Sequence, residues 1–234
     1  IKKEYQLSDI ALNNLEANFI SKFDAFLKIE KGCAQNSAIT RLKNLKKIIR
    51  IALENDWIKK DPFAYYRFKP EKTDPEFLTM DEIKIILAKE FTIKRVEQVR
   101  DVFVFCIFTG LAFSDVKDLS PEHLVKDNKG ELWIRKNRQK TKIMCNIPVL
   151  PVAASILDKY KDVAECTGKL LPVLCNQRMN SYLKEIADVC GIHKNLSTHV
   201  ARHSYATSIC LANGVSMENV AKMLGHADTS VTKH

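Results

Sequence analysis

The amino-acid sequence predicts a mainly α-helical protein with one small antiparallel β-sheet, organised as two domains. Apolar residues recur at helical spacing along most of the 234 residues, whereas residues 131–150 alternate around a polar centre, which is typical of a β-hairpin. Residues 61–77 contain three prolines and no sustained period, which is typical of a linker. We therefore expect a smaller helical domain over residues 1–70 and a larger domain over residues 71–234.

The smaller domain is predicted to contain two helices. Apolar residues follow helical spacing over residues 8–29, where a Lys-Gly pair then gives a stop signal, and again over residues 37–55. The second helix carries many basic side chains and almost no acidic ones, which favours contacts with phosphate groups over a merely solvated face. The predicted DNA-phosphate ligands are Arg41, Lys43, Lys46, Lys47 and Arg50.

The larger domain is predicted to begin with a helix that Thr79 caps, because Glu82 follows three positions later and completes a capping box. A strongly apolar helix over residues 95–108 comes next and is broken at Gly110, before a short second helix. After the hairpin, the pattern is helical again from Pro151 onward.

The composition favours a polyanionic partner and a reducing compartment. Lys and Arg number 37 against 28 Asp and Glu, a formal net charge of +9, so nucleic acid is the first partner to consider. The 7 cysteines are odd in number and form no C-x-x-C pair, which argues against disulfides and zinc knuckles and favours the cytoplasm. No apolar run approaches the ~20 residues that span a bilayer, so we expect no membrane partner.

The segment "STHVARHSYAT", residues 197–207, is the strongest candidate for a site. A cap at Ser197 or Thr198 would start a helix there, so that His199 and Arg202 project from one face near the positive helix end, where anions bind. For this spacing alone, a surface His–Arg pair is the alternative. His203 follows His199 by four positions, but no carboxylate accompanies the pair, so we expect no metal and interpret His203 as a buried helix residue.

Two further cations could reach the same anion. Lys140 is predicted at the tip of the hairpin, from which a long side chain could enter a site formed elsewhere, although most such lysines are simply solvated. His226 follows Gly225 at the end of an amphipathic helix, where helix capping is the alternative.

The order of these motifs resembles the catalytic domain of the tyrosine recombinases, the phage-integrase family. The motifs are "TGLAFSDVKDL", a hairpin that carries "KT" and ends in "IPVL", "STHVARHSYAT" and "MLGHADTSVTKH". The resemblance spans roughly residues 77–234, and residues 1–70, with "ENDWIKKDPF", resemble the helical, SAM-like core-binding domain of that family. The first motif is most similar to integrases of Bacteroides-type mobile elements.

The resemblance implies a role for each matched residue. Arg202 would bind two oxygens of the scissile phosphate, and His199 would bind the phosphate and exchange a proton with the nucleophile. His226 matches the histidine of the family's L-G-H motif. Lys140 would be the general acid that protonates the leaving 5′-oxygen, and Asp115 would brace the site.

The sequence departs from the family at the first catalytic arginine. Ala112 occupies that position, and alanine cannot contact phosphate. An intact enzyme should therefore have a replacement, and the options are Arg100, Arg135, Arg138 and Arg178.

A second departure concerns the nucleophile. The family's tyrosine follows "LGH" by nine positions, which corresponds to the position after His234. Tyr205, one turn after Arg202, is interpreted as a core residue instead.

We expect a site-specific DNA recombinase that cuts and rejoins duplex DNA through a 3′-phosphotyrosyl intermediate and mobilises a phage or transposon-like element. The resemblance also implies a homotetramer on paired DNA sites, DNA-bending accessory proteins and no cofactor. A non-catalytic DNA-binding protein on the same fold is the alternative, because Ala112 and the missing tyrosine would both fit a lost activity. A metal-dependent nuclease would need a carboxylate cluster that the sequence lacks.

Overall fold

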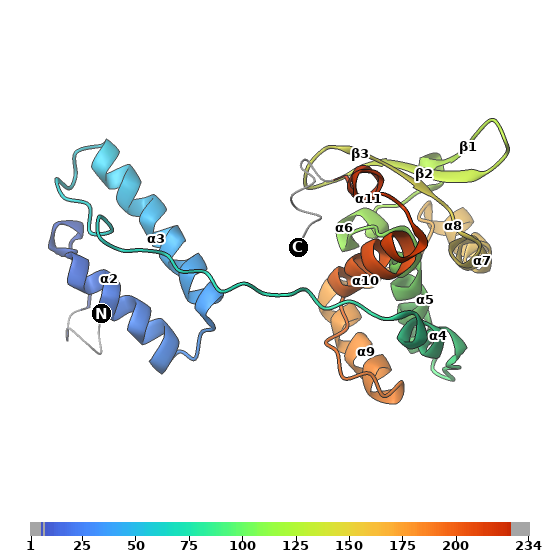
Figure 1. Ribbon diagram of the computed structural model, residues 1–234, viewed down its shortest axis with the longest axis horizontal. Coiled ribbons are helices and arrows are strands. Elements are labelled where there is room, and N and C mark those ends of the chain that lie inside the picture. The colour runs from blue at the N-terminus through green and yellow to red at the C-terminus, as the bar shows by residue number, and fades with distance from the viewer. Residues whose placement is uncertain (1–5, 7, 226–234) are drawn as a thin grey trace. The chain divides into compact units, whose positions relative to one another are not determined.

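The chain forms two compact units, Ile1–Thr73 and Asp74–His234, in a computed structural model that describes residue 6 and residues 8–225 (Figure 1). Each unit has its own hydrophobic core. The elements are helices apart from one three-stranded antiparallel sheet in the larger unit, so the predicted fold class is confirmed.

The smaller unit is built on two helices, α2 (Ala17–Ala25) and α3 (Gln35–Glu54), which contact each other (Figure 1). A π-helical turn at Phe26–Glu30 extends α2. The predicted helix start at residue 8 is wrong, because a separate 3-10 turn occupies Leu12–Asn14 and the α-helix begins only at Ala17. Two consecutive asparagines in this turn favour local side-chain to backbone bonding over a helix interior.

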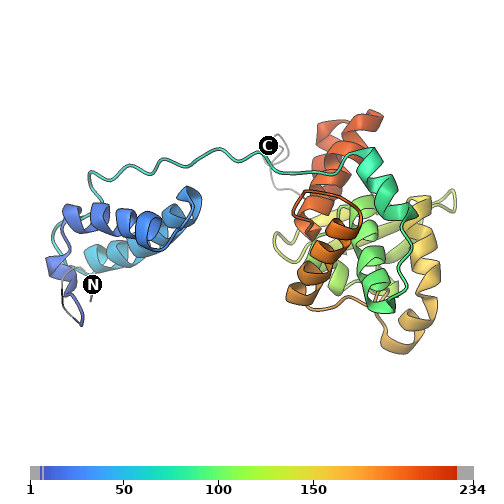
Figure 2. The same cartoon turned by 90° about the horizontal axis from the view of Figure 1, so that it is seen from below.

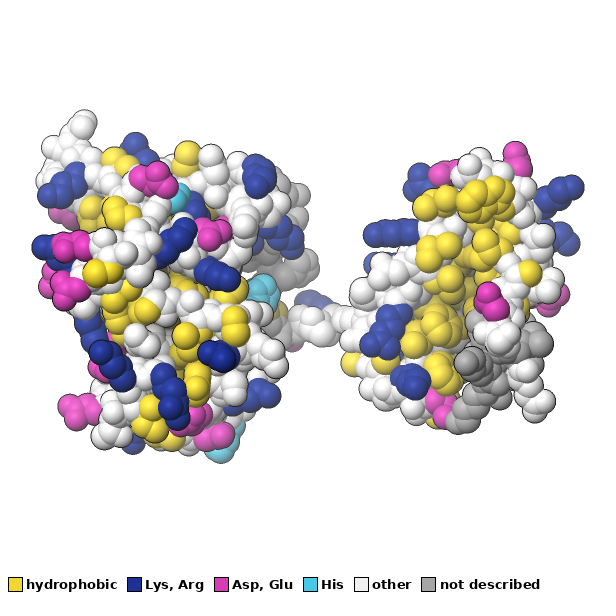
Figure 3. Space-filling model, turned by 180° about the vertical axis from the view of Figure 1, so that it is seen from behind, with side chains coloured by type: hydrophobic (Ala, Val, Ile, Leu, Met, Phe, Trp, Pro, Cys, Tyr) yellow, Lys and Arg dark blue, Asp and Glu magenta, His cyan; other side chains and the backbone are white. Residues whose placement is uncertain are grey.

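Buried side chains from both helices and from the segment after α3 form the core of the smaller unit. Its members are Ile20, Leu27, Ala38, Leu42, Ile49, Ala52, Ile58 and Phe63. Some large hydrophobic side chains of this unit stay exposed. Figure 3 shows a band of hydrophobic side chains on one face of the unit, with Lys and Arg at its margins. Those with more than half of their surface exposed are Ile29, Ile48, Ile51, Trp57 and Tyr65.

The segment that leads from the smaller to the larger unit has no regular secondary structure between residues 66 and 79. Its first part is attached to the start of α3, because the Gln35 side chain donates to the carbonyl of Lys69 at 2.7 Å. Asn36 exchanges two hydrogen bonds with the backbone of Glu71, at 2.8 and 3.0 Å. These bonds explain why the first unit extends as far as Thr73.

The larger unit places helix α5 (Lys94–Thr109) at its centre, in contact with α4, α7, α9 and α10 (Figure 1, Figure 2). Every residue from Asp101 to Thr109 is buried, as expected for a helix that is covered on all sides. The other helices are α4 (Met80–Ala88), α6 (Phe113–Lys117), α7 (Pro151–Lys159), α8 (Lys161–Thr167), α9 (Asn176–Val189), α10 (Thr198–Ser204) and α11 (Met217–Leu224).

The start of the larger unit is held by side-chain hydrogen bonds. The predicted capping box is confirmed: Thr79 accepts from the Glu82 backbone N–H at 3.3 Å, and the Glu82 carboxylate accepts from the Thr79 N–H at 2.7 Å. The backbone of Leu78 bonds to the hydroxyls of Ser204 and Ser208, at 2.8 and 2.5 Å. These bonds fix the segment before α4 against α10 and the turn that follows it.

The sheet contains β1 (Leu124–Lys126), β2 (Leu132–Asn137) and β3 (Met144–Pro148), in the order β1-β2-β3. The predicted hairpin corresponds to β2 and β3, with Ile134 opposite Ile147 on the buried face. The sequence did not indicate β1, because three residues are too few to establish a period of two.

None of the described helices combines the length and the apolar character needed to cross a membrane. Within the same residues, no three His, Cys, Asp or Glu side chains are grouped closely enough to hold a metal ion.

Candidate active site

Arg202 is buried on α10, and its guanidinium donates to two backbone carbonyls from other segments. The hydroxyl of Ser197 caps α10 by accepting from the Val200 N–H at 3.3 Å, which settles the predicted cap in favour of Ser197. One turn later, Arg202 donates from Nη1 to the carbonyl of Gly110 at 2.6 Å and from Nη2 to that of Leu224 at 2.5 Å. Burial lowers the pKa of Arg202 to about 10, so it stays charged at neutral pH.

The carbonyl that binds Arg202 belongs to a glycine that no other residue can replace without strain. Gly110 ends α5 in the left-handed conformation, with φ of 66°. A Cβ at this position would overlap the ring of Tyr205 and lie 2.7 Å from Cδ2 of Leu224. The break in the helix at Gly110 therefore brings the end of α5 directly against α10 and α11.

Asp115, which is 2% exposed on α6, anchors the turn between β2 and β3. Its Oδ1 accepts a hydrogen bond from the backbone N–H of Gln139 at 2.8 Å. The turn itself is closed by two bonds: the Arg138 N–H donates to Ile143 at 2.9 Å, and the Lys142 N–H donates to Arg138 at 2.8 Å. A buried carboxylate thus holds the hairpin turn at the start of α6.

The side chain of Arg138 lies close to this carboxylate. Its side chain is 14% exposed, and its Nε is 3.9 Å from Oδ2 of Asp115, which is too long for a hydrogen bond. Within the described part of the chain, this buried Nε has no hydrogen-bond partner. The Cδ of Arg138 lies 3.4 Å from where a Cβ on Gly225 would be, so the side chain extends toward the end of α11.

The positively charged side chains of this region all lower the pKa of His199. Partial desolvation lowers the pKa of His199, and the positive charges of Arg202, Lys140 and Arg138 lower it further. The ring of His203 packs edge-to-face on that of His199, with centroids 4.6 Å apart. His203 is partly buried rather than fully buried as expected, and its pKa is also lowered, first by desolvation.

The structure therefore brings together three of the four residues that the sequence predicted to be catalytic, and the supporting residue Asp115. Lys140 is exposed in the hairpin turn, His199 and Arg202 come from α10, and Asp115 holds the turn. The fourth predicted catalytic residue, His226, lies outside the described residues.

The hairpin turn is also attached to the end of α11, next to the position of His226 in the sequence. The hydroxyl of Thr141 donates to the carbonyl of Gly225 at 3.1 Å. Gly225 has φ of 61°, and a Cβ there would come within 2.7 Å of the Sγ of Cys145. Gly225 is therefore fixed against the same turn that carries Lys140.

Ala112 is the N-cap residue of α6, and its side chain is only a methyl group. Of the replacement options, Arg100 is engaged elsewhere, because it donates to Asp101 at 2.7 Å and to the carbonyl of Lys89 at 3.1 Å. Arg178 is exposed in the first turn of α9 and is not among the charges that shift the pKa of His199.

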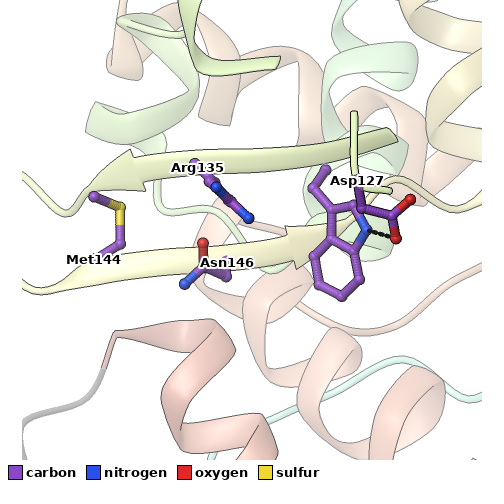
Figure 4. A pocket seen from close by; sticks show the side chains of 5 residues that line it. Asp127, Arg135, Met144 and Asn146 are labelled. Atoms are coloured by element: carbon purple, nitrogen blue, oxygen red, sulfur yellow. Dashed lines mark hydrogen bonds between the residues drawn. The ribbon is translucent and has the colours of Figure 1, made fainter. Parts of the chain in front are cut away.

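Arg135, the remaining option besides Arg138, lies on the outer face of the sheet. It lines a shallow hollow of about 420 Å³ there, and its side chain points into the space above β2 and β3 (Figure 4). Trp133 forms one wall and donates from Nε1 to Asp127 at 3.2 Å. This hollow is on the opposite face from buried Ile134 and Cys145, so Arg135 faces away from Arg202.

The basic residues predicted to contact phosphates lie on α3, but not all on one face. At about 100° per residue, Lys43, Lys46, Lys47 and Arg50 share one side of the helix, and Arg41 lies on the other. Arg41 donates to the Sγ of Cys33 at 3.1 Å. We call Lys43, Lys46, Lys47 and Arg50 the basic stripe. It borders the core residue Phe63, because the Lys46 amine lies 5.7 Å from the centroid of that ring.

Tyr205 is a core residue, as expected. It is 1% exposed, its hydroxyl donates to the sulfur of Met223 at 3.3 Å, and burial raises its pKa. A buried, hydrogen-bonded phenol with a raised pKa is a poor nucleophile.

Comparison with known families accounts for nearly the whole chain. A model of the phage integrase SAM-like domain matches residues 2–70, and a model of the phage integrase family matches residues 76–234. The chain belongs to the phage integrase family. Curated relatives of this integrase include the tyrosine recombinase XerD of Lacticaseibacillus casei, 28% identical over 228 residues, which cover 89% of this chain and 75% of that protein. XerC of Syntrophus aciditrophicus is 26% identical over 183 residues, which cover 70% of this chain and 57% of that protein.

Solved structures share the fold of this integrase. A lambda integrase dimer bound to a COC′ core site has a TM-score of 0.78 at 19% identity, covering 97% of this chain and 81% of that one. The Tn1549 transposon integrase in complex with circular intermediate DNA has a TM-score of 0.73 at 15% identity, covering 98% and 83%. At these identities the likeness establishes the fold alone.

Sequence reasoning did not separate Arg138 from the other arginines, although the structure places it beside Asp115 and Arg202. A usable signal was present. Arg138 stands two positions before Lys140, at the end of a predicted strand, so both side chains must leave the hairpin close to its tip.

Proposed function

We propose that this integrase is a site-specific DNA recombinase that cuts and rejoins DNA strands and mobilises a phage or transposon-like element, of the kind found in Bacteroides-type elements. One observation supports the proposal: the positive charges of Arg202 on α10 and of Lys140 and Arg138 on the distant hairpin all act on the imidazole of His199 and lower its pKa. Such a cluster suits a scissile phosphodiester, whose negative charge grows in the transition state.

The proposed reaction assigns one task to each group. A tyrosine oxygen attacks phosphorus while the bond from phosphorus to the 5′-oxygen breaks, which leaves a 3′-phosphotyrosyl link and a free 5′-hydroxyl. His199 accepts the tyrosine proton, which requires a neutral imidazole, and the lowered pKa of His199 supports this form at neutral pH. Lys140 gives a proton to the 5′-oxygen, and Arg202 binds two non-bridging oxygens. The matching role of His226 is carried over from the family motif.

The smaller unit is proposed to bind duplex DNA through phosphate contacts of the basic stripe. The DNA complexes among the structural neighbours support a DNA partner. We also propose that the protein acts in the cytoplasm as a homotetramer on two paired DNA sites. DNA-bending accessory proteins are its proposed partners. The core-binding domain is proposed to span residues 1–70 and the catalytic domain residues 71–234, so that the residues from 71 to Thr73, which belong to the first compact unit, join the catalytic domain.

The proposal is tested by trapping the covalent intermediate. The protein with a tyrosine at position 235, which the family spacing gives to the nucleophile, is incubated with a nicked suicide substrate that carries its core site. We expect a covalent protein–DNA adduct, and none when position 235 carries phenylalanine. An adduct that forms equally with phenylalanine would assign the nucleophile elsewhere. DNA binding without an adduct would favour the non-catalytic DNA-binding alternative, which the methyl group of Ala112 supports.

A further inference from the structure

One charged side chain lies on the inner face of the sheet, near the end of β2. Leu132, Ile134 and Lys136 alternate along this strand with residues of the outer face, and Lys136 lies opposite the buried Cys145. A lysine at a partly buried position is uncommon unless polar groups surround its ammonium. The partners of Lys136 join β2 to two other segments of the larger unit.

The ammonium of Lys136 contacts the end of α6 and the turn that follows it. It donates to the carbonyl of Asp118 at 3.3 Å and lies 3.2 Å from Nε2 of His123. Asp118 is the C-cap residue of α6, where carbonyls are free to accept from a cation, and His123 ends the 3-10 turn Pro121–His123. One side chain of β2 therefore holds both segments.

The contact with His123 belongs to a chain of hydrogen bonds. An ammonium can only donate, so Nε2 accepts from Lys136 and the neutral imidazole carries its proton on Nδ1. This N–H donates to the hydroxyl of Ser120 at 2.7 Å, and the hydroxyl donates to Oε1 of Glu122 at 2.8 Å. The longer contact of Nδ1 with the Ser120 N–H, 3.2 Å, is not a bond in this tautomer. The chain fixes the orientation of the ring that faces Lys136.

The same end of α6 also holds the turn between β2 and β3. Oδ1 of Asp115 accepts from the backbone N–H of Gln139 at 2.8 Å, and the side-chain amide of Gln139 lies 3.5 Å from Oδ2 of Asp118. Lys136 is the last inward-facing residue of β2, and Gln139, two positions after the strand, directly precedes Lys140. The contacts with α6 therefore hold the hairpin on both sides of the point where β2 ends.

Lys136 is not a member of the site itself. Its ammonium is occupied by two protein partners, and it does not contribute to the lowered pKa of His199, whereas Lys140 does. An effect of Lys136 on the reaction must therefore act through the hairpin turn. A general acid has to lie within hydrogen-bond reach of the leaving oxygen, and a misplacement of about 1 Å can slow a reaction about 100-fold.

We propose that Lys136 is a positioning residue for the general acid Lys140, because it holds the end of β2 against α6 and His123 and so fixes where the turn places Lys140. This inference rests on the proposed function, in which Lys140 protonates the leaving 5′-oxygen. It gives a role to Lys136, His123 and Ser120, which no motif of the sequence indicated.

The test changes the leaving atom, which separates proton donation from the other requirements of the reaction. A suicide substrate with sulfur in place of the bridging 5′-oxygen releases a thiolate, which is far more stable as an anion than an alkoxide and needs no general acid. The rate of adduct formation is measured on the oxygen and the sulfur substrates, with tyrosine at position 235.

The variants are Lys136→Met, Lys136→Arg and His123→Phe, with Lys140→Ala as the reference for a lost general acid. Lys126→Met is the matched control, because Lys126 is exposed at the end of β1 in the same sheet. Thermal unfolding is recorded for each variant, and His123→Phe serves if Lys136→Met does not fold.

On the oxygen substrate, we expect Lys136→Met to react about 10- to 100-fold more slowly than the unaltered protein, and Lys126→Met to react at the normal rate. On the sulfur substrate, the defects of Lys136→Met and Lys140→Ala should both fall below about threefold. Lys136→Arg, which keeps a donor for the carbonyl of Asp118, should recover most of the rate. His123→Phe, which removes one acceptor, should show a smaller defect of the same kind.

Two results would overturn the inference alone. A normal rate for Lys136→Met on the oxygen substrate would leave this side chain without a role in the reaction. An equal defect on both substrates would show that Lys136 acts through the fold as a whole and not through the proton donor.

Two other results would overturn the proposed function, and the inference with it. If sulfur did not rescue Lys140→Ala, Lys140 would not be the general acid. If the unaltered protein formed no adduct on either substrate, it would not be a recombinase of the proposed kind.

Discussion

The guanidinium of Arg202 and the carbonyl oxygen of Gly110 lie 2.6 Å apart and join α10 to the end of α5. Because the helix breaks at a left-handed glycine, the carbonyl is free to accept a side-chain donor instead of an N–H from the next turn. The position of the most buried cation in the site thus depends on the backbone conformation of one residue.

Gly110→Ala is expected to destabilise the larger unit by roughly 2–4 kcal/mol, since the new Cβ combines left-handed strain with overlap on Tyr205 and Leu224. Gly168→Ala is the matched control. Gly168 ends α8 with φ of 67° and nothing lies within 4 Å of its Cβ position, so only the strain of about 1 kcal/mol applies. Urea unfolding measures both, and equal losses would contradict the role of close packing at Gly110.

Asp115→Ala is expected to lower the free energy of unfolding by about 2–3 kcal/mol, because it leaves the Gln139 N–H unpaired and Arg138 without a facing charge. Asp115→Asn keeps an oxygen for the Gln139 N–H and should cost less. Chemical denaturation of the two variants separates the hydrogen bond from the charge. If both variants lost the same stability, the anchoring bond to Gln139 would not be the main contribution of this side chain.

The stability of the larger unit is expected to depend on pH through His199. Its pKa in the folded state is lowered from 6.5, so the unfolded chain binds the proton more tightly. Stability is therefore fully present above about pH 6.5 and decreases as the pH falls toward the folded-state pKa. His199→Gln should reduce this decrease, as measured by urea unfolding at about pH 5.5 and pH 7.5. Because His203 is shifted in the same direction, some decrease should persist in the variant.

DNA binding by the smaller unit is expected to depend on the basic stripe and not on Arg41. Lys43→Ala and Lys47→Ala should each reduce the slope of log K against log salt concentration by about 0.9, the value for one phosphate contact. Arg41→Ala, on the other side of α3 beside Cys33, should leave the slope unchanged. Fluorescence anisotropy with duplex DNA over a range of salt concentrations measures the slope. A change at Arg41 equal to that at Lys47 would place the DNA contact elsewhere.

Most of the fold could be predicted from the sequence because its determinants are local. The capping box of Thr79 and Glu82, the helix break at Gly110 and the alternation on β2 and β3 each depend on a few neighbouring residues. The predicted start of the first helix was wrong, because the apolar spacing continued through two asparagines that lie in a 3-10 turn. Apolar periodicity indicates which side chains are buried. It does not show where side-chain to backbone hydrogen bonds favour a turn over a helix.

The candidate site could be predicted only in part, because its remaining features depend on contacts between distant segments. Arg202 and His199 share one helix, so their common face follows from spacing alone. The position of Arg138 depends on a bond between Gln139 and Asp115, 24 residues apart in the sequence, which no local pattern indicates. The sequence could therefore name four arginines as replacements, and the packing of the hairpin on α6 was needed to separate them.

The length of the short turn between Arg138 and Ile143 is constrained by the bonds that hold it. Two backbone bonds close it, Asp115 holds it from one side and Gly225 from the other. A single inserted or deleted residue would shift Lys140 out of its present position relative to Asp115 and Gly225. Homologues that share this arrangement should therefore vary freely in the identity of exposed hairpin residues while conserving the length of the loop.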